Sequence, residues 1–165
     1  MAVEAEVGRL LSARGWRLAV AETSTGGFIG YLLTTIPGSS SYFDRSIVAY
    51  SNQAKETSLA IPPTTLERHG AVSQMTALAM ATHVQGLSQV EVGLAVTGLT
   101  GPRMGRSSKP IGLTYIAVAL PQTTLWWEGV IPGERAEIQR ESAFKALERL
   151  RDALLRDGKD VVRQA

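Results

Sequence analysis

Two short polar segments carry the side chains best suited to nucleophilic catalysis. Residues 22–27 read Glu-Thr-Ser-Thr-Gly-Gly and include the hydroxyls of Thr23 and Ser24. A hydroxyl attacks a carbonyl carbon when a base lies close enough to take its proton. The second segment holds Tyr50 and Lys55, and a buried lysine is neutral enough to act as that base. The residue types therefore indicate acyl transfer, provided that the fold brings the two segments together.

Each of these residues also has a plainer interpretation. Ser and Thr before a helix commonly cap it, and the spacing alone favours a cap for the hydroxyls of 22–27. A lysine one turn after a cap is usually a solvated surface charge. A tyrosine such as Tyr50 at the end of a strand usually packs its ring and leaves its hydroxyl outward. Only burial of Lys55 would distinguish the catalytic interpretation from the plain one.

A third segment, residues 98–112, combines glycines with cations. Its backbone amides, together with Arg103, Arg106 and Lys109, could hold a phosphate. The segment does not have the spacing of a P-loop, because Pro110 follows the lysine, and its glycines do not form the dinucleotide-binding fingerprint.

Hydrophobic periodicity predicts the elements that must position these segments. We expect a first helix ending at Arg14, helices over 28–35 and 64–68, one starting at Asn52, one over 74–86, and a last helix from Glu134, with a polar tail that frays beyond Gly158. The expected strands cover 16–21, 43–50, 90–97, 111–120 and 123–131.

This order of elements predicts an α/β fold. Helices alternate with the first three strands, so we expect a three-layer α/β/α sandwich whose sheet is made mixed by a final hairpin. No linker divides residues 1–165, which indicates a single domain. Ligands of open α/β sheets bind at the carboxyl ends of strands. The loops 22–27, 50–55 and 97–112 are therefore expected to converge there.

Composition excludes several classes of function. The chain has no cysteine and only two histidines, which excludes thiolate chemistry and argues against a zinc site. A net charge of +2 without a basic stripe does not indicate a nucleic-acid partner. With no signal peptide and no apolar run of membrane-spanning length, we expect a cytoplasmic protein without a membrane partner.

Six motifs in order resemble the CinA C-terminal domain family, over about residues 16–156. Residues 21–27 resemble its A-E-S-C-T-G-G, and 48–55 match its V-x-Y-S-N-x-A-K. The other four are P-G-S-S at 37–40, H-G-A-V-S at 69–73, V-T-G-L-T-G-P at 96–102 and K-P-I-G at 109–112.

The resemblance implies hydrolysis of the carboxamide of nicotinamide mononucleotide, without metal or cofactor, in a protein that forms dimers or larger assemblies. It assigns the nucleophile to Thr23 and the general base pair to Tyr50 and Lys55. The chain departs from the family pattern in having Thr23 for serine, Ser24 for cysteine, Met104 for glycine and Arg106 for Ser or Thr. The branched Cβ of threonine restricts its rotamers, so Ser24 is retained as an alternative nucleophile.

We therefore expect Thr23, Ser24, Tyr50 and Lys55 to be catalytic, acting on a small nucleotide. A nucleotide-binding module without catalysis and a protein-interaction module are the alternatives, motivated by Thr23 and Met104. The residues expected to contact substrate are Thr25, Gly26, Gly27, Ser51, Asn52, Gly98, Thr100, Gly101, Arg103, Arg106 and Lys109.

Overall fold

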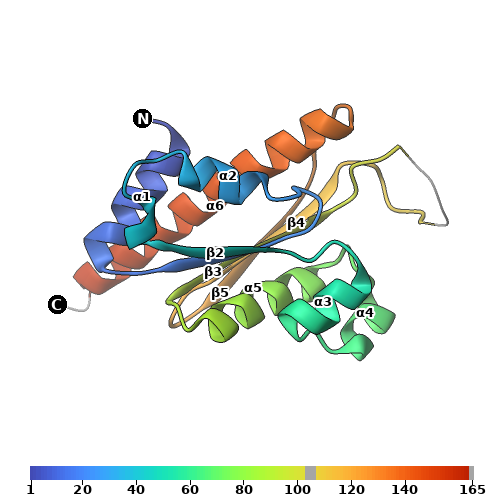
Figure 1. The fold of residues 1–165 in the computed structure, drawn as a ribbon, viewed down its shortest axis with the longest axis horizontal. Helices are drawn as coiled ribbons and strands as arrows, with labels where there is room; N and C mark the ends of the chain where they lie inside the picture. The colour runs from blue at the N-terminus through green and yellow to red at the C-terminus, as the bar shows by residue number, and fades with distance from the viewer. Residues whose placement is uncertain (103–106, 164–165) are drawn as a thin grey trace.

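A five-stranded mixed sheet with helices on both faces forms the centre of the molecule (Figure 1). The structure is a computed structural model that describes residues 1–102 and 107–163, with the backbone alone for 158–163. The strands are β1 (Leu18–Glu22), β2 (Phe43–Val48), β3 (Val92–Gly98), β4 (Leu113–Ala119) and β5 (Thr124–Val130), and their order in the sheet is β2-β1-β3-β4-β5. The expected α/β sandwich with a mixed sheet is confirmed.

The parallel strands direct their carboxyl ends to one edge of the sheet. β1 pairs in parallel with both β2 and β3, whereas β4 pairs antiparallel with β3 and with β5. The chain leaves β1 for β2 on one side and returns to β3 on the other, so the strand order reverses at β1. Such a switch point opens a crevice at the carboxyl ends.

Two helical layers cover the sheet (Figure 1). One contains α1 (Val3–Arg14), α2 (Phe28–Thr34) and α6 (Arg135–Arg163), and the other contains α3 (Asn52–Leu59), α4 (Pro63–His69) and α5 (Gln74–Ser88); a short 3-10 turn, Ser39–Ser41, precedes β2. Local signals set several helix boundaries. Ser51 and Ser73 accept from the amides of Ala54 and Thr76 at the starts of α3 and α5. α6 continues past Gly158 to Arg163.

Side chains alternate between the two faces of the sheet and build two cores. Leu18 and Val20 pack toward α1, α2 and α6, while Ala19 and Ala21 pack toward α5. The face under α5 is made of small residues, so this helix lies very close to the sheet. At Gly93 an added Cβ would lie 2.1 Å from a carbonyl oxygen of α5, which only glycine permits.

Candidate active site

Lys55 is the most unusual residue of the three loops, because its side chain is buried. It belongs to α3 and is 2% exposed. Its Nζ donates to the carbonyl of Tyr50 at 3.1 Å and, more weakly, to that of Ser51 at 3.5 Å. No carboxylate forms an ion pair with it among the described residues. Burial therefore lowers the pKa of the Lys55 amine below its ordinary value of 10.5.

Thr23 and Ser24 follow β1 and are both buried. The Thr23 hydroxyl donates to the carbonyl of Val96 at 3.0 Å. The Ser24 Oγ has no hydrogen-bond partner among the described residues. In the part of the chain that the structure describes, neither hydroxyl is hydrogen-bonded to the Lys55 amine.

The two hydroxyls belong to opposite faces of the sheet. Ser24 Oγ lies 3.2 Å from where a Cβ on Gly98 would be, beside Thr114 Oγ1 at 3.0 Å from the same point. Thr114 in turn meets Ser142 of α6 at 3.4 Å, so Ser24 faces the α6 layer. Alternation along the extended chain directs Thr23 toward the layer of α5 and Lys55, and its hydroxyl lies against β3 at the Val96 carbonyl.

Glu22 has a role that the sequence interpretation missed. Its fully buried carboxylate accepts from the amides of Gly27, Ile29 and Gly30, at 2.9 to 3.1 Å, and from the hydroxyls of Thr25 and Ser46 at 2.7 Å. No hydroxyl of 22–27 caps α2, so the expected cap was wrong. A carboxylate replaces it because an anion at a helix start also meets the positive end of the helix dipole.

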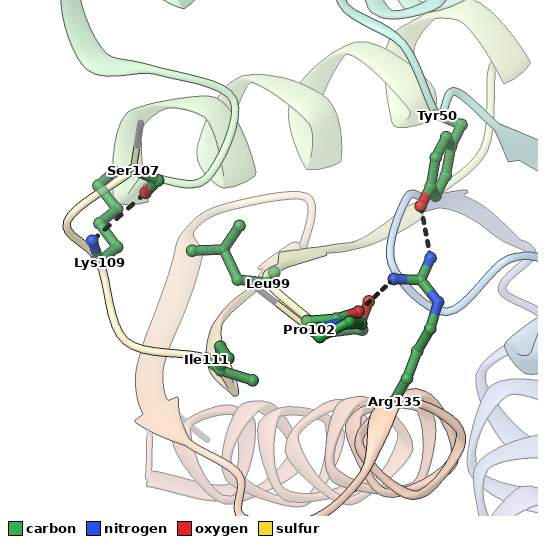
Figure 2. Close-up of a pocket in the computed structure, with 10 residues that line it drawn as sticks. Tyr50, Leu99, Pro102, Ser107, Lys109, Ile111 and Arg135 are labelled. Atoms are coloured by element: carbon green, nitrogen blue, oxygen red, sulfur yellow. Dashed lines mark hydrogen bonds between the residues drawn. The ribbon is translucent and has the colours of Figure 1, made fainter. Parts of the chain in front are cut away.

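A pocket of about 320 Å³ opens at the carboxyl edge of the sheet (Figure 2). Tyr50, Arg135 and Lys109 bring polar side chains to it, and residues 98–102 form one wall with Ile111 and Ser107. Arg135, in the first turn of α6, donates to the Tyr50 hydroxyl at 2.8 Å and to the carbonyl of Gly101 at 2.6 Å. The guanidinium therefore orients the Tyr50 ring, which is otherwise 59% exposed.

The expected substrate-binding residues divide between two places. Gly98, Thr100, Gly101 and Lys109 line the pocket, and the Lys109 amine also donates to the carbonyl of Val72.

Thr25, Gly26 and Gly27 instead line a second hollow against Gln139 and Arg140 of α6. Ser51 caps α3, and Asn52 begins it and is exposed. Arg103 and Arg106, with Met104, lie outside the described residues.

Sequence interpretation missed two contributors from α6. Arg135 reaches Tyr50 from 85 residues away, and Gln139 donates to the carbonyl of Ser24 at 3.0 Å from 115 residues away. Both look like ordinary polar positions at the start of an amphipathic helix. The one local signal was their spacing of four residues, which places them on the same helix face.

Comparison with known proteins identifies the family. The model of the CinA C-terminal domain matches residues 1–154. The chain belongs to the CinA C-terminal domain family. A CinA-like protein of Syntrophobacter fumaroxidans is 43% identical over 145 residues, which are 88% of this chain and 34% of that protein. A CinA-like protein of Anaeromyxobacter sp. (strain Fw109-5) is 42% identical over 144 residues, 87% of this chain and 35% of the relative. This CinA domain thus spans about a third of the length of the curated relatives that it matches.

Solved structures of the CinA superfamily share the fold. The competence/damage inducible protein CihA of Agrobacterium tumefaciens is 37% identical, with a TM-score of 0.83 and coverage of 93% of this chain and 96% of that one. A CinA superfamily protein from Klebsiella pneumoniae is 27% identical with a TM-score of 0.90 and the same coverage, 93% and 96%.

Within residues 1–102 and 107–157 no three His, Asp or Glu side chains gather as metal ligands would. None of the helices described by the structure has the length and apolar character needed to cross a membrane.

Proposed function

We propose that this domain is an amidohydrolase that converts nicotinamide mononucleotide to nicotinate mononucleotide and ammonia. The observation that carries the proposal is the buried Lys55 amine, which has carbonyl oxygens but no carboxylate as described partners. Burying an amine without a counter-ion opposes folding, so a structural role does not explain it. A lowered pKa, by contrast, is what a general base requires.

Thr23 is the nucleophile in this proposal. Alternation directs it toward the layer of α5 and Lys55, whereas Ser24 faces α6. In the resting state the Thr23 hydroxyl donates to the Val96 carbonyl. Substrate binding would redirect that hydrogen toward the Lys55 amine, since hydrogen bonds between catalytic groups often tighten only when substrate is present.

The reaction proceeds by covalent acyl transfer. Thr23 Oγ1 bonds to the carboxamide carbon while its proton passes to the neutral Lys55 Nζ, with Tyr50 as the partner of the base. The proton then moves to the leaving nitrogen, the C–N bond breaks and ammonia departs, which leaves an ester on Thr23. Water, deprotonated by the same amine, attacks the ester carbon and releases nicotinate mononucleotide, and Thr23 regains its proton.

The pocket supplies groups for the developing negative charge and for the phosphate. The amide of Gly26 donates to the backbone carbonyl of Thr23, and the amide of Gly27 donates to the Glu22 carboxylate. Neither amide is therefore available to bind an oxyanion. The amides of Thr100 and Gly101 donate to no other described residue, and they line the pocket. We assign them to the oxyanion, and Lys109 and Arg135 to the phosphate.

Release of ammonia from nicotinamide mononucleotide by the purified protein tests the proposal, with an active relative as the positive control. Thr23→Val should lower kcat by at least about a hundredfold, the lower range for loss of a catalytic group, and Thr23→Ser should retain activity. Ser24→Ala is the matched control and should stay within about threefold of wild type, because its hydroxyl faces the other layer. No turnover by wild type would defeat the amidase assignment, and the reverse pattern would transfer the nucleophile to Ser24.

A nucleotide-binding module without catalysis is the second candidate. It is favoured by the absence of a described hydrogen bond between Lys55 and either hydroxyl. A rise in melting temperature with nicotinamide mononucleotide but no ammonia would support it, because a ligand that binds only the folded state stabilises it.

The proposal also includes a cytoplasmic location and a homo-oligomeric state. Sedimentation of the purified protein at several concentrations would test self-association. A single species with the mass of one chain at all concentrations would contradict the homo-oligomeric state.

A further inference from the structure

Gln139 joins the long helix α6 to the turn that carries Thr23. Its Nε2 donates to the carbonyl oxygen of Ser24 at 3.0 Å. A Cβ added to Gly26 would lie 3.9 Å from the same nitrogen. The side-chain amide of Gln139 therefore lies close to the middle of the turn. Gln139 lines the hollow beside the turn and not the pocket that holds Tyr50, and the proposed chemistry does not use it.

The turn needs such a support because of its own backbone. Gly26 and Gly27 have φ values of +60° and +98°, which glycine adopts freely but does not maintain by itself. Within the turn the amide of Gly26 holds the carbonyl of Thr23 at 3.1 Å. The next carbonyl, that of Ser24, is held only by Gln139 among the described residues.

The helix that supplies this support is anchored in the core and contacts the other two loops as well. Ile138, next to Gln139, is 1% exposed and anchors α6 in the core. Arg135 lies one turn earlier, on the same face of α6. Arg135 holds Tyr50 and Gly101, so two side chains of one helix face bind the loops that follow β1, β2 and β3.

We propose that Gln139 is a positioning residue, which fixes the Ser24 peptide so that the Thr23 hydroxyl is held on the face of the sheet that contains Lys55. The inference rests on the proposed amidase function. It adds to that function a residue that touches neither substrate nor base. Its effect should fall on kcat more than on KM, because it changes the orientation of the attacking group and not the walls of the pocket.

Gln139→Met and Gln139→Glu test the inference. Methionine has a similar length and cannot donate, so kcat should fall by about 10- to 100-fold, the cost of a small misplacement of a reacting group, with KM changed by less than about threefold. Glutamate cannot donate while ionised, but its protonated form can. The ratio of kcat for Gln139→Glu to kcat for Gln139→Met should therefore rise as the pH falls toward the carboxyl pKa of about 4.3. Glu22 and Arg140, the charged groups of the turn and of the hollow, are the same in both variants.

Glu141→Gln is the matched control, because Glu141 is exposed on the same helix and has no described hydrogen bond or ion pair. It should leave kcat unchanged. A kcat ratio for the two Gln139 variants that does not vary with pH, or Gln139→Met with wild-type kcat, would overturn the inference.

Amide hydrogen exchange of the peptide over 18–30 separates this inference from the amidase assignment. Exchange should quicken in Gln139→Met and not in Glu141→Gln, since the turn loses the hydrogen bond that α6 donates to it. Unchanged exchange in Gln139→Met overturns the positioning role even if the wild-type protein is active. Faster exchange in Gln139→Met, combined with no turnover by the wild-type protein, supports the contact between Gln139 and the turn. That result defeats only the amidase proposal.

Discussion

Replacing Lys55 by methionine should stabilise the fold while it removes most of the activity. Methionine has a similar length and buries no charge, and Lys55 is only 2% exposed. The effective penalty for burying one ion is several kcal/mol, whereas a hydrogen bond from a charged donor returns about 1.5–3 kcal/mol. Only the 3.1 Å bond to Tyr50 counts fully, because the contact with Ser51 is at 3.5 Å. We therefore expect Lys55→Met to gain about 1–2 kcal/mol near neutral pH.

The gain in stability of Lys55→Met over wild type should decrease as the pH rises. Burial lowers the pKa of Lys55 in the folded state below 10.5, so the unfolded chain binds the proton more tightly. Below the lowered pKa both states carry the charge and the wild-type fold bears the full penalty. As the pH rises toward 10.5 the penalty disappears, and the advantage of Lys55→Met should shrink to nothing.

Thermal unfolding of both proteins between about pH 6 and pH 10, around the ordinary lysine pKa, measures this difference. A gain of 1–2 kcal/mol corresponds to a rise in Tm of about 2–8 °C for a chain of this size. The kcat of Lys55→Met should fall by about 10²–10⁴, the usual worth of a general base. A Tm that falls in Lys55→Met by an amount independent of pH would show that a charged Lys55 holds the fold together, and the reasoning would fail.

Three further outcomes follow from the same geometry. Since the base must be neutral, kcat/KM should rise with pH through the lowered pKa of Lys55; a profile that falls over this range would exclude Lys55 as the base. Arg135→Met should lower kcat/KM by about 10- to 100-fold with Tm little changed, because the exposed Tyr50 ring loses its 2.8 Å bond; unchanged kinetics would remove Arg135 from the site. In denaturant titrations Gly93→Ala should cost about 3 kcal/mol or more, because its Cβ would lie 2.1 Å from a carbonyl of α5. Gly86→Ala, with no atom within 4 Å, should instead gain about 0.5–1 kcal/mol, and equal effects of the two would contradict this account of the packing.

Much of the fold could be predicted because its signals are local. Ser51 and Ser73 cap the helices that they precede, and serine directly before a helix is a common cap. The strand boundaries shifted by at most two residues, for example from 16–21 to Leu18–Glu22, because pairing with neighbours decides where a strand ends. The adjacent tryptophans 126 and 127 divide between surface and core as alternation requires.

The helix cap at α2 shows where local reasoning failed. Hydroxyls directly before a helix usually cap it, yet Glu22 takes that role from within a strand. The Glu22 carboxylate can reach the first amides of α2 because it stands at the end of β1, next to the start of that helix. Ser46 of the neighbouring strand β2 donates a further hydrogen bond to it. Only strand pairing brings that hydroxyl to the carboxylate.

What the sequence by itself determined is the order of the elements, the family and the three polar loops, because helix periods, strand alternation and capping act over a few residues. The tertiary structure alone decided that Lys55 is buried, that Ser24 faces the α6 layer, and that Arg135 and Gln139 arrive from 85 and 115 residues away. The physical reason is that burial and long-range hydrogen bonds depend on which layers pack together. That packing follows from the whole sheet order, and no short stretch of sequence contains it.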